Sequence, residues 1–201
     1  MQDFQAFTIK FSGITNVLCC NVGVSAAFDI KAITENKPDI LEALSIWDTG
    51  ATCTVISKDF ATKLGLVPTG KTKITGVNHT TEENTYIVNV YLPNKVCVGF
   101  VKIAEVPAIS NNAGILIGMD IIAAGDFSVF TENKKTVMTY RLPSIGGVDY
   151  VQEAGNIRNK RAILQKFDEQ KKHRKTLSPK NRKKGKQEKK NKKNKHNKKK
   201  K

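Results

Sequence analysis

The sequence predicts an all-β domain of about 140 residues, followed by a short linker and a cationic tail. Apolar and polar residues alternate with a period of two, as along Phe7–Phe11 and Thr136–Tyr140. Turn-forming residues separate these runs, and only short segments carry helical spacing. A body of this size is sufficient for one compact domain and too small for two.

The charge of the chain is concentrated at one end. The 201 residues carry a formal net charge of +16. Residues 171–201 contain 18 Lys and Arg and one acid, a net +17, whereas residues 1–170 contain 16 basic and 17 acidic side chains, a net −1. The body is therefore not a basic nucleic-acid-binding domain. The Lys- and Asn-rich tail lacks Phe, Trp and Tyr, which predicts disorder and contact with RNA, DNA or an anionic surface, or a merely solubilising role.

The remaining composition bounds the location and the chemistry. No apolar run approaches the roughly 20 residues that span a bilayer, and the first residues lack the pattern of a signal peptide. We therefore expect a cytoplasmic protein, with the nucleus as the alternative in a eukaryotic host. The four cysteines lack metal-ligand spacing, so we expect free thiols and neither a metal nor a cofactor: Cys19, Cys20, Cys53 and Cys97.

The first 42 residues are expected to form a β extension of the domain. Phe7–Phe11 is followed by turn residues 13–16, and residues 17–24 are expected to return as the second strand of a hairpin. Further along, the apolar run Leu44–Trp47 ends abruptly at Asp48.

A short strand and a short helix are expected next. Residues 54–56 favour a strand, and Ser57 is a good N-cap. Phe60 and Leu64 are spaced to share one helix face, and Gly65 is suited to end the helix.

The centre of the chain predicts a long hairpin and a further strand. Residues 71–77 and 85–92 flank a polar segment, 79–84, which is expected to be the turn. Residues 96–106 supply the next strand or two.

The last part of the body predicts a break, a helix and a hairpin. Gly118 breaks the apolar run 113–117, and residues 119–124 suit a short helix. Residues 127–130 and 136–141 then form the final hairpin.

We assign residues 1–142 to the domain, with residues 1–42 as its extension. Residues 143–170 are a linker in which a helical pattern begins, extending over residues 153–175. Residues 171–201 are the tail.

The segment most clearly suited to catalytic chemistry is Asp48-Thr49-Gly50-Ala51. It places a carboxylate directly after a core strand, in a turn where a glycine N–H can approach it closely. The same three residue types also form ordinary Asx turns, so the tripeptide alone leaves both interpretations open.

Two later motifs favour the catalytic interpretation. A hairpin tip with the sequence Gly76-Val77-Asn78-His79 follows at a distance suited to a flap, and Leu116-Ile117-Gly118 precedes the short helix. This ordered set resembles the retropepsin-like (retroviral-type) aspartic proteases, and its extension to Asp120 is more similar to the cellular and bacterial members than to the viral enzymes. Thr52 and Cys53 depart from the family, because viral members commonly have acids there.

The resemblance implies a small closed β fold with a flap hairpin and one or two short helices. It implies catalysis by Asp48, with Thr49 bonding across a pair of active-site aspartates, Gly50 holding the carboxylate and Ala51 binding the substrate main chain. Residues 76–79 would cover the substrate, and Leu116, Ile117 and Gly118 would be the second structural motif.

Peptide hydrolysis by carboxylates requires two of them, one to take a proton from water and one to give a proton. The chain has no second Asp-Thr-Gly or Asp-Ser-Gly, because Asp120 and Asp126 are followed by Ile and Phe. The second carboxylate must then be Asp48 of another copy, which predicts a homodimer acting on a peptide or protein substrate.

Two other functions stay open from the sequence. One is a catalytically weak member of the fold that binds peptides or dimerises. The other is a nucleic-acid-associated protein localised by its basic tail.

For single residues near the site we expect packing roles. Trp47 is expected to pack in the core or in a dimer interface. Cys53 is expected as a buried thiol, and Asp120 at the positive end of the short helix.

Overall fold

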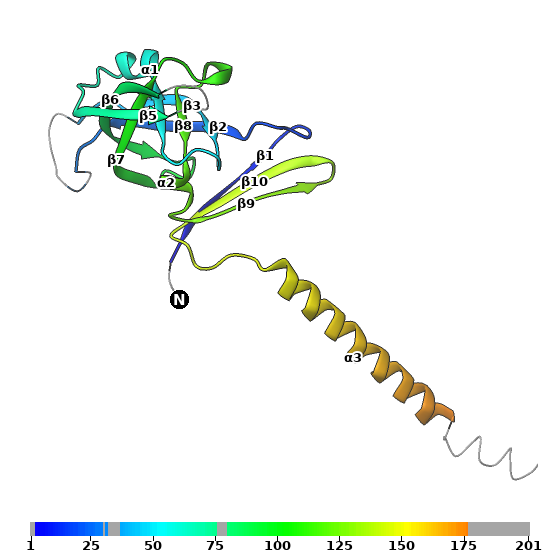
Figure 1. Ribbon diagram of the computed structural model, residues 1–201. Coiled ribbons are helices and arrows are strands. Elements are labelled where there is room, and N and C mark those ends of the chain that lie inside the picture. Colours follow the sequence, from blue (N-terminus) through cyan, green and yellow to red (C-terminus); the bar gives the residue numbers. More distant parts are fainter. Residues whose placement is uncertain (1–2, 30, 32–36, 76–79, 177–201) are drawn as a thin grey trace, which may run out of the picture. The chain divides into compact units, whose positions relative to one another are not determined.

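The computed structural model describes residues 3–29, 31, 37–75 and 80–176 (Figure 1). The chain divides into one unit spanning residues 1–147 and a second spanning residues 148–201. The predicted all-β fold is confirmed in the first unit.

A closed β barrel forms the body of the first unit. Its strands follow the order β2-β3-β8-β4-β7-β6-β5, and β2 also pairs with β6, so six strands close on themselves while β5 extends β6. The strands are β2 (Cys19–Ala26), β3 (Leu41–Trp47), β4 (Val55–Ser57), β5 (Gly70–Thr75), β6 (Thr80–Tyr91), β7 (Cys97–Val106) and β8 (Ile115–Ile117).

The barrel interior is filled by aliphatic side chains from most of these strands. Val24, Ile56, Val88, Val90 and Ile115 are completely buried. Burial of each such side chain contributes roughly 1.5–3 kcal/mol to the stability of the fold, which explains why strands as short as β4 and β8 are stable parts of the barrel.

A three-stranded antiparallel sheet, in the order β1-β10-β9, completes the first unit (Figure 1). It consists of β1 (Gln5–Lys10), β9 (Asp126–Glu132) and β10 (Lys135–Leu142). The hairpin predicted for the N-terminal residues is therefore wrong, because β1 pairs with β10 and β2 pairs with β3 and β6. The physical reason is that Phe7 packs its ring 5.9 Å from that of Tyr140, which a local hairpin would not permit.

The short helices agree with the sequence. α1 (Lys58–Lys63) begins at Ser57, whose hydroxyl accepts from the Phe60 N–H at 3.4 Å, and Gly65 follows at φ +63°. α2 (Met119–Ile122) follows Gly118, and a 3₁₀ turn, η1, spans Ser110–Asn112.

The long hairpin β5–β6 is confirmed, but β6 begins at Thr80, earlier than predicted. Residues 80–84 belong to β6 and pair with β5, with Lys71 opposite Asn84 and Lys73 opposite Glu82. Polar residues occupy both faces of this exposed ribbon, which explains why their composition suggested a turn. The last hairpin, β9–β10, is confirmed.

The second unit contains α3 (Tyr150–Thr176), whose described side chains are exposed. Asp149 precedes it and accepts from the Val151 and Gln152 N–H groups at 2.9 and 3.1 Å, as an N-cap does. The helix continues six residues into the segment for which disorder was expected, and residues 177–201 lie outside the described part. None of the helices in the described ranges combines the length and apolarity needed to cross a bilayer.

Candidate active site

Asp48 stands at the turn that follows β3. Its N–H donates to the Ile117 carbonyl at 3.0 Å, and its own carbonyl accepts from the Ala51 N–H at 3.2 Å. The Gly50 N–H donates to Asp48 Oδ1 at 2.8 Å, and a β-carbon on Gly50 would lie 3.1 Å from that oxygen. The turn therefore fixes one carboxylate oxygen through the backbone. The Asp48 side chain is half-buried, and Thr49 and Gly50 are exposed.

Aromatic packing anchors the end of β3, directly before Asp48. The Trp47 ring stacks on Phe127 of β9 at 5.7 Å and lies 5.1 Å from Tyr140 of β10. The Tyr140 hydroxyl donates to the Ile121 carbonyl at 2.7 Å, and burial raises the pKa of Tyr140 to about 12. The expected core role of Trp47 is confirmed, since it is 4% exposed.

The second motif contacts the Asp48 turn directly. The Met119 N–H donates to the Ala51 carbonyl at 2.8 Å, and the Asp120 N–H donates to the Thr52 carbonyl at 3.2 Å. A β-carbon on Gly118 would lie 2.5 Å from the carbonyl carbon of Cys53. Only glycine permits this approach, so the apolar-apolar-Gly spacing has a steric cause.

A pair of residues that the sequence reasoning missed holds these two segments together. Thr54 is completely buried, and its hydroxyl donates to Asp120 Oδ1 at 2.7 Å while accepting from the Gly118 N–H at 3.1 Å. The Asp120 carboxylate also accepts from the Thr54 N–H at 3.0 Å and the Ile121 N–H at 3.0 Å. Asp120 therefore does more than favour a helix end, because it joins the turn to α2. The sequence offered one signal for this pair. Thr54 lies three residues after Ala51, and Asp120 lies two residues after Gly118, so each is close to one of the two motifs.

Asp126, the other aspartate near the second motif, is hydrogen-bonded to residues outside the Asp48 turn. Its carboxylate accepts from Ser144 Oγ at 2.5 Å, the Ile145 N–H at 3.0 Å and Arg141 Nε at 2.5 Å. These three bonds, that of Ser144 first, lower the pKa of Asp126 to about 2. Neither Asp120 nor Asp126 is available as a second catalytic carboxylate beside Asp48.

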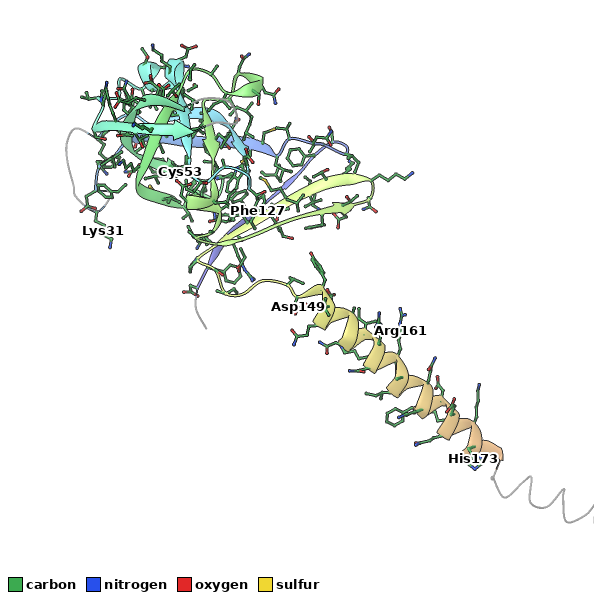
Figure 2. The ribbon with its side chains drawn as sticks, viewed as in Figure 1. Lys31, Cys53, Phe127, Asp149, Arg161 and His173 are labelled. Atoms are coloured by element: carbon green, nitrogen blue, oxygen red, sulfur yellow. The ribbon has the colours of Figure 1, made fainter. Side chains whose placement is uncertain are left out.

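A pocket of about 630 Å³ lies beside the Asp48 turn, and we call it the β5–β7 pocket. Its lining residues are Gly50, Ala51, Thr52, Cys53, Val55, Thr72, Lys73, Thr85, Lys102, Ile103 and Ala104. Cys53 is exposed here, so the expectation of a buried thiol is wrong (Figure 2). The turn that carries Cys53 faces the pocket instead of the core. The predicted flap residues Gly76, Val77, Asn78 and His79 lie outside the described residues.

Residues 42–124 match the family model of the gag-polyprotein putative aspartyl protease. This match supports the retropepsin-like aspartic protease family that the sequence motifs predicted. The match begins in β3 and ends just after α2, so it contains the Asp48 turn, the β5–β6 hairpin and the second motif.

Among solved structures, one similar chain is a retropepsin-like aspartic protease from Rickettsia conorii. It has a TM-score of 0.42 and 14% sequence identity, and the alignment covers 70% of this chain and 96% of that one. No curated protein matches the chain.

In this retropepsin-like domain the structure brings together two of the three predicted motifs. The turn at residues 48–51 and the motif at residues 116–118 share backbone hydrogen bonds through Ile117 and Ala51. The third motif, residues 76–79, lies outside the described residues, and the flanking strands β5 and β6 border the pocket through Thr72, Lys73 and Thr85. Within the described ranges, no group of three or more His, Cys, Asp and Glu side chains could hold a metal ion.

Proposed function

We propose that this retropepsin-like protein is an aspartic endopeptidase whose catalytic pair is formed by Asp48 of two copies. The observation that carries the proposal is the Asp48 turn, which holds one carboxylate oxygen through the Gly50 N–H and leaves the side chain accessible. Asp120 and Asp126 are both engaged in other hydrogen bonds, so a single copy supplies one such carboxylate.

The chemistry follows from pairing two Asp48 side chains. Two close carboxylates cannot both ionise easily, so the pair shares one proton, and its two apparent pKa values belong to the pair. The ionised member takes a proton from water as that water attacks the peptide carbonyl, and the protonated member donates to the carbonyl oxygen. On collapse the leaving nitrogen takes a proton and the pair returns to its starting state. In this proposal Thr49 of each copy bonds across the pair, and Ala51 binds the substrate main chain.

The first test is the substitution Asp48→Asn, which removes the ionisable group and keeps the shape. We expect loss of cleavage of a peptide library, and of any pepstatin-sensitive activity, with an unchanged circular dichroism spectrum and oligomeric state. Asp39→Asn, at an exposed position, is the matched control and should cleave normally. Wild-type proteolysis by purified Asp48→Asn protein would overturn the mechanism.

The second test asks whether both carboxylates come from different copies. When wild-type and Asp48→Asn proteins are mixed in equal amounts and allowed to exchange subunits, activity should fall to about one quarter, because only wild-type pairs are active. An enzyme acting as a monomer would retain about one half. Light scattering at tens of micromolar that detected only monomer would count against the pair.

A second function rests on a separate observation, the net +17 of residues 171–201. We propose that this tail contacts polyanions, because neutralising phosphates releases counterions and binding then weakens steeply with salt. A chain lacking residues 171–201 should lose binding to RNA and DNA and keep peptide cleavage. Binding that survived the deletion would place the contact elsewhere. A domain that bound peptides without cleaving them would instead indicate the catalytically weak alternative.

A further inference from the structure

The lining of the β5–β7 pocket is positively charged, whereas the first unit as a whole is close to neutral. Its lining contains two ammonium groups, Lys73 of β5 and Lys102 of β7, and none of the described residues that line it is an Asp or a Glu. Both lysine side chains are exposed. The first unit as a whole is not cationic, since the basic excess of the chain lies in residues 171–201. The positive character is therefore a local property of this pocket.

The acids of the neighbouring strand β6 do not neutralise the pocket. Glu82 stands opposite Lys73 in the strand register, but its carboxylate pairs with Lys71, at 3.4 Å. Glu83 stands opposite Thr72 in the strand register and is not part of the pocket lining. No ion pair within 4.0 Å joins Lys73 or Lys102 to a described carboxylate. A carboxylate that entered the pocket would thus meet two cations that have no carboxylate partner among the described residues.

The other lining residues complete a site suited to a carboxylate on a short apolar stem. Hydroxyl groups stand at Thr52, Thr72 and Thr85, and Ile103 and Ala104 are buried floor residues. Hydrogen bonds between an ammonium or hydroxyl donor and a carboxylate are stronger than neutral ones, and the floor can contact methylene groups. A volume of about 630 Å³ accommodates a side chain together with adjoining main chain.

The position of the pocket relates it to the catalytic residue. Gly50 and Ala51, which line it, are two and three residues after Asp48 in the same turn. A peptide lying across that turn therefore presents a side chain to the pocket close to the bond that Asp48 would attack. At the places where viral relatives commonly carry acids, Thr52 and Cys53 leave the lysines unopposed.

We propose that the β5–β7 pocket is a specificity site that selects a substrate residue with a carboxylate side chain, so that acidic peptide segments are the preferred substrates. The proposal rests on the endopeptidase function proposed above, and it names the substrate class of that same site. Because exposed ion pairs are each worth at most about a fivefold change in an equilibrium, two lysines predict a preference of roughly five- to twentyfold.

The experiment uses the full chain and peptides of constant net charge. Each peptide carries one Glu, placed at one of the three positions on either side of the cleaved bond, and otherwise Gln, so that attraction to the basic tail is equal for all. We expect one Glu position to raise kcat/KM roughly five- to twentyfold over the others. The same position should strengthen binding to the Asp48→Asn protein, measured by fluorescence anisotropy.

Substitutions then assign the preference to the pocket. The double variant Lys73→Gln/Lys102→Gln should bring the ratio of best to worst Glu position close to one, and Lys102→Glu should favour Lys at that position. Lys58→Gln, on α1 and outside the pocket, is the matched control and should keep the wild-type ratio. If Lys102→Glu fails to fold, the single Lys102→Gln variant provides the same comparison.

The outcomes separate this inference from the proposed function. Equal binding and cleavage at every Glu position, or a preference unchanged by the double variant, would overturn the inference. Position-dependent binding to the Asp48→Asn protein that the double variant removes would support it, even if wild type cleaved no peptide and the endopeptidase function failed.

Discussion

Replacing Thr54 by Val tests whether the buried hydrogen bonds behind the Asp48 turn hold the site. Valine has the shape of threonine, so the change removes the hydroxyl and little else. In wild type this hydroxyl donates to Asp120 at 2.7 Å and accepts from the Gly118 N–H at 3.1 Å. Thr54 is completely buried, so water cannot take the place of its hydroxyl at the buried Gly118 N–H, whereas the exposed Asp120 carboxylate can be hydrated.

The magnitude can be worked from these two bonds. The buried Gly118 N–H would lose its partner, at about 1–3 kcal/mol, and the bond to the Asp120 carboxylate, which is exposed, is worth the lower end of its range, about 1.5 kcal/mol. The added methyl group returns part of this, about 0.8 kcal/mol. We expect the free energy of unfolding to fall by about 2–4 kcal/mol, which in a domain of this size lowers Tm by roughly 5–12 °C.

Denaturant titration and calorimetry of the full chain would measure the effect, with Thr62→Val as the control. Thr62 is exposed on α1, and its hydroxyl bonds only the Lys58 carbonyl, so the same chemical change should cost less than about 0.5 kcal/mol. A Thr54→Val protein as stable as the Thr62→Val protein would refute the reasoning that this hydroxyl is structurally required.

Two further substitutions test other contacts that stabilise the first unit. Gly118→Ala should destabilise by about 2 kcal/mol or more, because the new β-carbon would lie 2.5 Å from the Cys53 carbonyl carbon, whereas Gly13→Ala, with open space around it, should be neutral; denaturant titration of both decides. Asp126→Asn should destabilise the domain at neutral pH, where the carboxylate held by Ser144 is ionised. Because the folded pKa of about 2 is below the ordinary 3.8, the contribution is complete above about pH 4 and is lost as the pH falls through 2. The difference in Tm between wild type and Asp126→Asn should therefore shrink over that range, and a difference independent of pH would contradict the assignment.

The features that the sequence predicts correctly are those with a local cause. Ser57 caps α1 because its hydroxyl reaches an N–H three residues later, and Gly65 ends the helix because its φ is positive. The family resemblance groups the Asp48 turn and Gly118 as two motifs of one site, and the close approach of Gly118 to Cys53 supplies the steric reason for the glycine.

The features that the sequence does not predict depend on contacts between distant segments. Alternation marks β1 as a strand, but it carries no information about its partner β10, which begins 125 residues further on. Likewise Thr54 and Asp120 meet across 66 residues, and neither has an unusual local pattern. The turn that carries Cys53 also depends on a distant segment, because Ala51 and Thr52 accept hydrogen bonds from the N–H groups of α2.

A site shared by two copies demands more accuracy from each copy than a site within one chain. If the Asp48 carboxylate of one copy is displaced by a given distance, the two-fold symmetry displaces its partner equally, and the error in their separation is up to twice as large. Catalytic groups must be placed within about 0.5 Å, and an error of 1 Å can cost about a hundredfold in rate. In the proposed pair each turn would have to be held to about 0.25 Å, and the hydrogen bonds through Thr54, Gly118 and Asp120 stand directly behind it. In the Thr54→Val protein the fold decrease in kcat should therefore exceed the fold increase in KM. The reason is that the substrate pocket stays in place while the carboxylate pair loosens. A change confined to KM would show that the network shapes the pocket and does not position the pair.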